Sequence, residues 1–387
     1  MTSFLQNIKS VPNYCILVLV SSTAILIGIE WDISWHESIG RDSFWSAPHM
    51  VIYFGGILCG FTCAWMVFQQ TIFHPDKYKH YVKFWGFKGP LACWICIWGM
   101  IAMLTSAPFD DWWHNTYGLD VQIVSPPHIV LAFGIFAIFL GSLQLVLAER
   151  NLAQESQKKI YDYLYLYAAS LILLQFCIIL TEYSFANKQH SLEFYKLSII
   201  FYGFVIIAFS EAARTKYAAT IIASLYMIHR LLILWILPLF EAEPLLGPIY
   251  REITHYVAPP FPPLLIIPAI IIDIVRSRFT LSNKILKAII FAIIFTLILL
   301  LTQWYFSEFL LSEYARNWVF CSDRNKPFWV PVGDFNFEYW DYDWTPYGHK
   351  IPMSPVTVKN MALTLVYSIF SIYLALLFSG WLKRVKK

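Results

Sequence analysis

The sequence predicts an all-α, polytopic integral membrane protein, a bundle of about ten transmembrane helices. Of its 387 residues, 58% are hydrophobic and 14% are charged, and the mean hydropathy is +0.56. A water-soluble domain carries about a quarter charged residues. The apolar residues also come in long blocks, which is typical of helices that cross a lipid bilayer.

Ten stretches are long and apolar enough to be read as spans: 13–31, 49–71, 90–109, 128–148, 161–182, 194–213, 218–240, 257–275, 286–306 and 358–382. The first has no small-residue cleavage site before Trp31, so we expect a retained span and not a signal peptide. The eighth contains five prolines, which predicts a broken or re-entrant helix that lines a cavity.

The distribution of basic residues predicts the orientation. Of 28 Lys and Arg residues, 18 fall in one alternating set of span ends and loops, nine fall in the other set, and the remaining one, Arg230, lies in the middle of a span. The positive-inside rule then places both termini in the cytoplasm and makes the inner membrane the expected location. Segments 32–48, 110–127, 183–193, 241–256 and 307–357 would face outward.

Four regions are expected along the chain. Residues 1–148 form a four-helix region with two metal-binding hairpins, and 149–306 a further bundle of about five helices. Residues 307–357 form an outward-facing cap rich in aromatic and acidic residues, in which Asp341, Asp343 and His349 are expected to be solvated. Residues 358–387 form the last span and a basic cytoplasmic tail.

Charge and cysteine content exclude two classes of protein. The net charge of +3 and the lack of a basic helix argue against a nucleic-acid partner. Six of seven cysteines lie in predicted spans and only Cys321 in an aqueous segment, which is not a disulfide framework.

Two clusters of Asp and His stand at the outer ends of the first two hairpins. Asp32 and His36 are four residues apart, so they share a helix face, and His49 opens the next span behind a proline. The second hairpin repeats this pattern with Asp110, His114 and His128, the last again behind proline.

One carboxylate and two imidazoles that converge from two helices make a ligand set for Cu, Zn or Fe, with positions left open. Trp, His and Asp are also common at membrane interfaces, so each cluster alone is compatible with an interfacial anchor. The repetition favours metal binding. Four histidines as haem ligands are a further alternative, which leaves the paired aspartates unexplained.

The stretch from Asp32 through Trp35, His36, Arg41 and Asp42 to His49 resembles the signature hairpin in the C subunit of the copper membrane monooxygenases, the particulate methane and ammonia monooxygenases. The resemblance covers residues 13–148. It implies that Asp32, His36 and His49 bind copper, that Trp35, Arg41 and Asp42 support these ligands, and that O2 and a small apolar substrate are used. Asp110, His114 and His128 match a second copper site of that family in which the first ligand is Asn, so the second metal is open.

Other polar groups in the spans are weaker candidates. Cys59, Cys63, Cys93 and Cys96 could form a soft-metal relay, although small apolar packing is the favoured interpretation. The pair His229-Arg230 lies in mid-span, where ionisable groups are usually functional, with Glu211 or Asp273 as a possible partner of the arginine. The segment with Glu241, Glu243 and His255 is a candidate for a degenerate third repeat.

The sequence therefore predicts a copper-binding membrane protein, with a copper-dependent monooxygenase- or oxidase-like subunit as the first hypothesis and Asp32, His36 and His49 as its candidate site. Copper uptake, storage or delivery without turnover is the alternative. A structural subunit of a larger complex that has kept metals for stability is the third hypothesis. Other membrane subunits, or further copies of the chain in a homo-oligomer, are possible partners.

Overall fold

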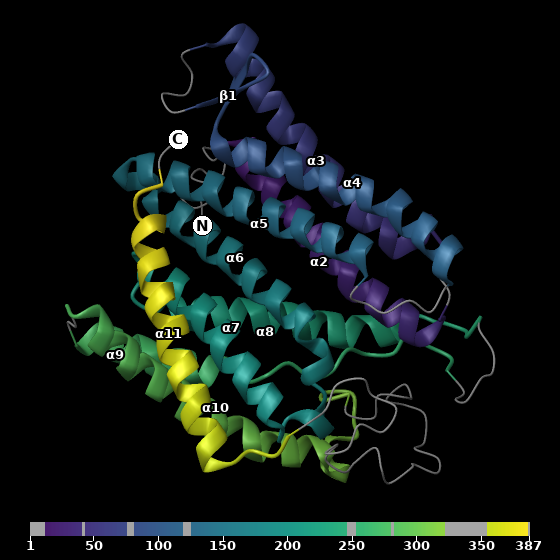
Figure 1. The fold of residues 1–387 in the computed structure, drawn as a ribbon, viewed down its shortest axis with the longest axis vertical. Helices are drawn as coiled ribbons and strands as arrows, with labels where there is room; N and C mark the ends of the chain where they lie inside the picture. Colours follow the sequence, from purple (N-terminus) through teal and green to yellow (C-terminus); the bar gives the residue numbers. More distant parts are fainter. Residues whose placement is uncertain are drawn as a thin grey trace. The chain divides into compact units, whose positions relative to one another are not determined.

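The computed structural model describes residues 12–40, 43–75, 81–118, 125–245, 253–279, 282–321 and 354–385 (Figure 1). The regular structure of this part of the chain is helical apart from one short hairpin and isolated bridges, and nine of its helices are long and apolar enough to cross a membrane. The predicted class, an all-α polytopic bundle, is confirmed. The nine helices coincide with nine of the ten predicted spans.

The chain folds into two compact units. The first comprises Met1–Asp32, Asp42–Ile172 and Leu382–Lys387. Its elements are the first twenty residues of α2 (Asn13–Ser38), α3 (Ala47–Phe68) with the π-helical turn η1 (Gln69–Phe73), β1 (Val82–Phe84), β2 (Phe87–Gly89), α4 (Leu91–Tyr117), α5 (Pro126–Leu152) and most of α6 (Glu155–Ile179).

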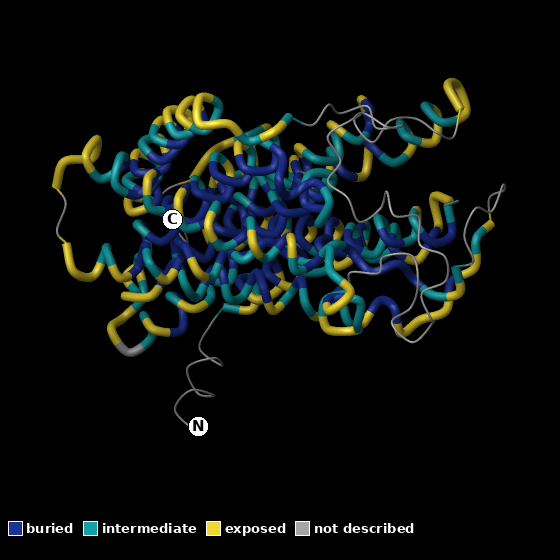
Figure 2. Tube along the Cα trace, turned by 90° about the horizontal axis from the view of Figure 1, so that it is seen from below, coloured by how far each residue is buried: buried dark blue, intermediate teal, exposed yellow. Residues whose placement is uncertain are grey.

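The second unit comprises Ile33–Arg41 and Leu173–Trp381. Its elements are α7 (Leu192–Ala212), α8 (Ala218–Ile236), α9 (Ile266–Arg278), α10 (Lys284–Leu311) and α11 (Val358–Leu382), with the short turns η2 (Thr181–Tyr183), η3 (Ala186–Lys188), η4 (Leu237–Leu239) and η5 (Glu313–Ala315). Figure 2 shows buried and exposed positions alternating along the helices.

Local sequence explains where the helices of the first unit begin. Pro48 stands in the first turn of α3, and Pro126 and Pro127 open α5. Proline is favoured there because the first turn has no intrahelical partner for its N–H and because the ring fixes a helical φ. Both prolines that precede the cluster histidines therefore fix a helix start, which places His49 and His128 in the first turn of α3 and α5.

Close backbone contacts pack α4 against α5. A Cβ added at Gly99 would lie 2.7 Å from the carbonyl oxygen of Gly134, and one at Gly134 would lie 2.7 Å from the carbonyl oxygen of Gly99. In a membrane, where apolar side chains gain little by leaving lipid, such small-residue contacts let van der Waals packing hold helices together.

The eighth predicted span is broken, as its prolines indicated. Residues 256–264 have no regular secondary structure, and only the 13-residue α9 follows them. Side chains from other helices of the second unit take up the free backbone groups: Arg230 Nη2 donates to the Pro260 carbonyl at 3.1 Å, and Gln303 Oε1 accepts from Leu264 N at 2.8 Å. Inside a bilayer, a backbone segment without helical hydrogen bonds is tolerated only where other protein groups bind its N–H and C=O groups.

The described chain begins and ends at the same end of α5. The Tyr14 hydroxyl donates to Glu149, and Asn151 Nδ2 donates to the carbonyl oxygen of Val385 at 2.8 Å. All four residues belong to the first unit. An even number of crossings requires this arrangement, whereas the side of the membrane remains a prediction.

Replacing Gly134 by Ala should destabilise the protein, because the new methyl group would collide with the Gly99 carbonyl. Overpacking of this kind costs about 1–3 kcal/mol. The loss should appear as a lower unfolding temperature in detergent. Gly380→Ala is the matched control, since a Cβ at this helical glycine meets nothing within 4 Å. Equal unfolding temperatures for the two variants would contradict the close contact.

The predicted orientation can be tested with single surface cysteines in a Cys321→Ser background, because the other six native cysteines are buried. Thr116 lies exposed at the predicted outer end of α4, and Lys83 in the hairpin at its predicted inner end. An impermeant thiol reagent should label Thr116→Cys in whole cells, and Lys83→Cys only after lysis. The reverse pattern would overturn the orientation.

Candidate metal centres

The first candidate centre joins the end of α2 to the start of α3. His49 Nε2 lies 3.3 Å from Asp32 Oδ1, and both side chains are about one-fifth exposed (19% and 20%). The other ring nitrogen, Nδ1, lies 3.0 Å from the carbonyl oxygen of Ser43. The predicted approach of His49 to the Asp32 face of the preceding helix is therefore observed.

The second candidate centre joins the end of α4 to the start of α5. A single carboxylate, Asp110, faces two imidazoles: Oδ2 lies 3.2 Å from His114 Nε2, and Oδ1 lies 3.6 Å from His128 Nε2. The His114 Nδ1 atom lies 3.3 Å from the Gly118 carbonyl oxygen, and that of His128 lies 3.0 Å from Ser125 Oγ. All three residues predicted for this centre thus come together.

The contacts of the Nδ1 atoms indicate that a cation lies between each imidazole and its carboxylate. A carbonyl oxygen only accepts hydrogen bonds, so the Nδ1 atoms of His49 and His114 carry the proton. In neutral rings, each Nε2 then presents a lone pair to a carboxylate oxygen, and the two lone pairs repel. A cation between them, either a proton or a metal ion, removes this repulsion. An Nδ1–H bonded to a carbonyl is also the usual way in which metal-ligating histidines are oriented.

The Asp110 carboxylate fits such an ion. Its Oδ1 atom is buried and lacks a hydrogen-bond partner, and the 3.6 Å to His128 Nε2 exceeds a hydrogen bond. Burying a charged oxygen without compensation is costly, and metal coordination offsets that cost.

The remaining residues predicted for the first centre are less completely placed. His36 is exposed one turn beyond Asp32 in α2, within the stretch Ile33–Arg41 of the second unit, so its approach to the Asp32–His49 pair stays a prediction. The ring of Trp35 packs against that of Tyr256, also in the second unit, with 6.1 Å between the ring centroids. Arg41 and Asp42 lie outside the described residues.

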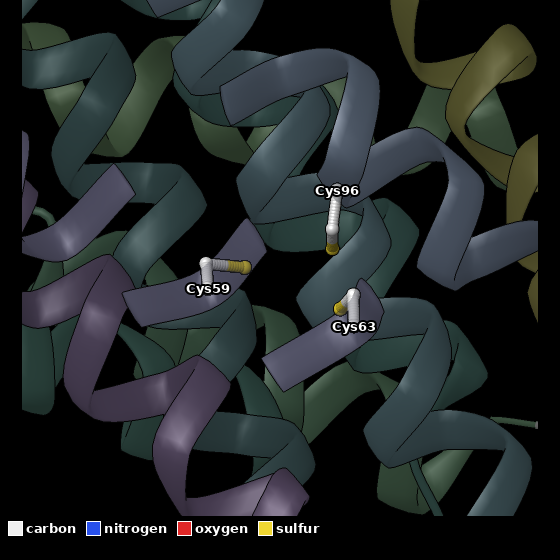
Figure 3. Close-up of side chains that lie close together, drawn as sticks. All are labelled: Cys59, Cys63 and Cys96. Atoms are coloured by element: carbon white, nitrogen blue, oxygen red, sulfur yellow. The ribbon is translucent and has the colours of Figure 1, made fainter. Parts of the chain in front are cut away.

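A third group consists of thiols in the middle of α3 and α4. The Sγ atoms of Cys59, Cys63 and Cys96 lie within 4.8 Å of one another, and all three side chains are buried (Figure 3). Among the described residues, no other set of three His, Cys, Asp or Glu side chains brings its ligand atoms this close. The group can hold a metal ion. The Asp/His donors are more widely spaced and would have to close around one.

Cys93, the fourth cysteine of the predicted relay, lies outside this closest set but next to it. Its thiol interacts with that of Cys63 and contacts the Met66 thioether at 3.8 Å.

Comparison with known protein families, with curated proteins and with solved structures found no match. Function must therefore be argued from the chemistry of these three groups.

The structure corrects the predicted partner of Arg230. Asp273 accepts from the backbone N–H groups of Ala219 and Thr220, in the first turn of α8, about three turns before Arg230 in that helix. Asp273 and Glu211 both pair with Arg276, at 2.6 and 3.0 Å. Neither acid is therefore the partner of Arg230, whose bond to the Pro260 carbonyl supports the broken span. His229 lies beside it in α8, and its role stays a prediction.

The other weak candidates remain open. Glu241 and His255 face each other across an isolated antiparallel bridge, so the third segment does bring a carboxylate residue and a histidine together. Glu243 is exposed. Asp341, Asp343 and His349 of the predicted cap lie outside the described residues.

Sequence reasoning missed the atoms that hold the histidine rings. Ser43, Gly118 and Ser125 supply them. Ser125 carries a recognisable signal, because a serine directly before two prolines that open a helix occupies the N-cap position. The contacts of Ser43 and Gly118 are made by backbone carbonyl groups, which every residue has, so the sequence gives no sign of them.

Replacing Asp110 by Ala should weaken metal binding at the second centre by more than the roughly 10–100-fold typical of residues that only support a ligand, because the shared carboxylate is lost. Competition with a chelator of known affinity measures the change. Asp111→Ala is the matched control, because this neighbouring acid is exposed and contacts Asn115 in its own helix. Equal metal affinity in the two variants would exclude Asp110 as a ligand.

Proposed function

We propose that this chain is a copper-binding membrane protein that holds the metal in its two Asp/His clusters, and that it acts as a copper-dependent monooxygenase- or oxidase-like subunit. The observation that carries the proposal is the repeated geometry at the ends of two successive hairpins. In each, a carboxylate from one helix end faces an imidazole from the first turn of the next helix, at 3.3 and 3.6 Å.

The ligand types support copper. Imidazole nitrogen and carboxylate oxygen suit Cu, Zn and Fe, and at a given site of this kind Cu(II) binds most strongly. The resemblance of the hairpin from Asp32 to His49 to the C subunit of the copper membrane monooxygenases points the same way. Bound copper would supply one-electron and O2 chemistry, for which few protein ligands and open positions are needed.

The chain's own residues would prepare the centres. The carboxylates of Asp32 and Asp110 supply negative charge that lowers the cost of holding a cation at the membrane boundary. The oxygens of Ser43 and Gly118 fix the tautomer in which Nε2 of His49 and His114 faces the metal position. The predicted outward orientation would give a small apolar substrate access from the outer face and the bilayer.

Copper uptake, storage or delivery without turnover is the second candidate. The buried group of Cys59, Cys63 and Cys96 favours it, because thiols select reduced copper and an oxygenase centre made of N/O ligands does not need them. O2 consumption by the purified, copper-loaded protein with a reductant and a short-chain alkane separates the two candidates. Turnover above the rate of free copper supports the first, and its absence together with transfer of copper to an acceptor chelator supports the second.

The purified wild-type protein should retain about one copper per Asp/His cluster after mild detergent extraction. His49→Ala and Asp32→Asn should each remove about one equivalent while the protein level in the membrane stays near normal, because helix packing does not depend on a polar group at the mouth. Elemental analysis and the EPR spectrum of Cu(II) measure the loss.

His74→Ala is the matched control, because His74 is exposed at the other end of the same helical stretch, next to η1. Retention of full copper by both His49→Ala and Asp32→Asn would reduce the first cluster to an interfacial anchor. Zinc alone, or a haem absorption band, in the wild type would rule out copper.

A further inference from the structure

We propose that Cys59, Cys63 and Cys96 form a Cu(I) site inside the membrane, separate from the Asp/His clusters. This inference deepens the proposed function, since it rests on copper as the metal that reaches the protein. The three Sγ atoms within 4.8 Å of one another come from two helices, with two thiols one turn apart on α3 and the third opposite on α4.

The backbone of α5 closes the thiol group on its remaining side. A Cβ added at Gly141 would lie 2.4 Å from Cys96 Sγ. The Ser142 hydroxyl lies 3.9 Å from the Cys59 sulfur. Any larger residue at position 141 would push the Cys96 thiol out of the group. The convergence of the thiols thus depends on a glycine in a third helix. If the cysteines only filled space as small residues, no such glycine would be required.

Further sulfur atoms lie along the same helix interface. Met66 contacts Cys93 at 3.8 Å. Met100 packs directly on Gly60, where an added Cβ would lie 2.1 Å from the Met100 sulfur. Met103 packs on Gly56, where an added Cβ would lie 3.4 Å from the Met103 sulfur. The α3–α4 interface therefore offers thiols and thioethers on both sides of the three-cysteine group, which are the ligands that select Cu(I).

Charge also favours a monovalent ion. The thiols are fully buried in helices predicted to cross the membrane, where each net charge is expensive. Cu(I) can replace the proton of one thiol, forming one copper–sulfur bond and releasing one proton, so that the site stays neutral. The other two sulfurs donate lone pairs. A divalent ion such as Zn²⁺ would need two deprotonated thiols for the same neutrality, and it favours four ligands. The ion is taken up already reduced, so no electron is transferred.

Two thioethers lie on α4 between the thiol group and the second Asp/His cluster. Along α4, Cys96 precedes Asp110 by 14 residues, which is about 21 Å at the rise of an α-helix. Met100 and Met103 lie between them on the face that contacts α3. The thiol site is therefore separate from the second cluster along the same helix.

The test uses the full-length protein in detergent, loaded anaerobically with Cu(I) from its bicinchoninate complex. Cu(I) affinity is measured by competition, and copper–sulfur bonds by X-ray absorption. The Cys96→Ser and Cys59→Ala variants should bind Cu(I) more weakly, by more than the roughly 10–100-fold typical of supporting residues, and should lose copper–sulfur scattering. The Cys15→Ser variant is the matched control, because Cys15 is equally buried, in α2.

The proposed site would be wrong if both variants kept the Cu(I) affinity of the wild type. It would also be wrong if X-ray absorption of the Cu(I)-loaded wild type showed no sulfur bound to copper. Loss of folding is checked separately by size-exclusion chromatography, and the wild-type scattering decides the question if a variant does not fold. The double variant His49→Ala/Asp110→Ala distinguishes the two proposals. If the Cu(I)-loaded double variant keeps copper–sulfur scattering and the as-purified double variant loses the Cu(II) EPR signal, both proposals stand. If it loses nothing, the Asp/His proposal fails and the thiol site remains.

Discussion

The contact between the backbones of α4 and α5 at Gly99 and Gly134 determines the geometry of two of the three candidate centres. It allows the two helices to approach more closely than side chains would permit, and their antiparallel course brings the last turns of α4 to the first turn of α5. The Asp110 carboxylate can therefore face His128 across the hairpin. About two turns after Gly134 in α5, the close packing of the two helices places Gly141 against the Cys96 thiol, which lies with the thiols of α3.

A second constraint is the absence of water around the helices, which obliges each exposed backbone group to find a partner in the protein. The proline-rich segment before α9 meets this demand with side chains: Ser34 donates to the Val257 carbonyl at 2.6 Å, and Ser38 accepts from the Val257 N–H at 2.8 Å. Together with Arg230 and Gln303, these serines bind the backbone of a segment that lacks the internal hydrogen bonds of a helix. Arg230 therefore has a structural contact to the broken segment, and a functional role of the pair His229-Arg230 stays a prediction.

Hydropathy was sufficient to predict the helices, because a span needs only length and apolar composition. The Asp32–His49 pair and the Asp110 cluster were also accessible, since a spacing of four marks a helix face and proline marks a helix start. The sequence indicated a group of four cysteines only as an alternative to packing, because their convergence depends on the rotation of α3 relative to α4. The structure brings three of them together. Glu211 and Asp273 were likewise only possible partners of Arg230, and the fold places them with Arg276.

The hydrogen bond from Asn151 to the Val385 carbonyl has a consequence for biosynthesis. The first unit combines Asp42–Ile172 with Leu382–Lys387, so the helices α7 to α11 are synthesised before all of its parts are present. Until α11 emerges, the amide of Asn151 at the end of α5 lacks this acceptor. A nascent chain that terminates within these helices would leave that position open.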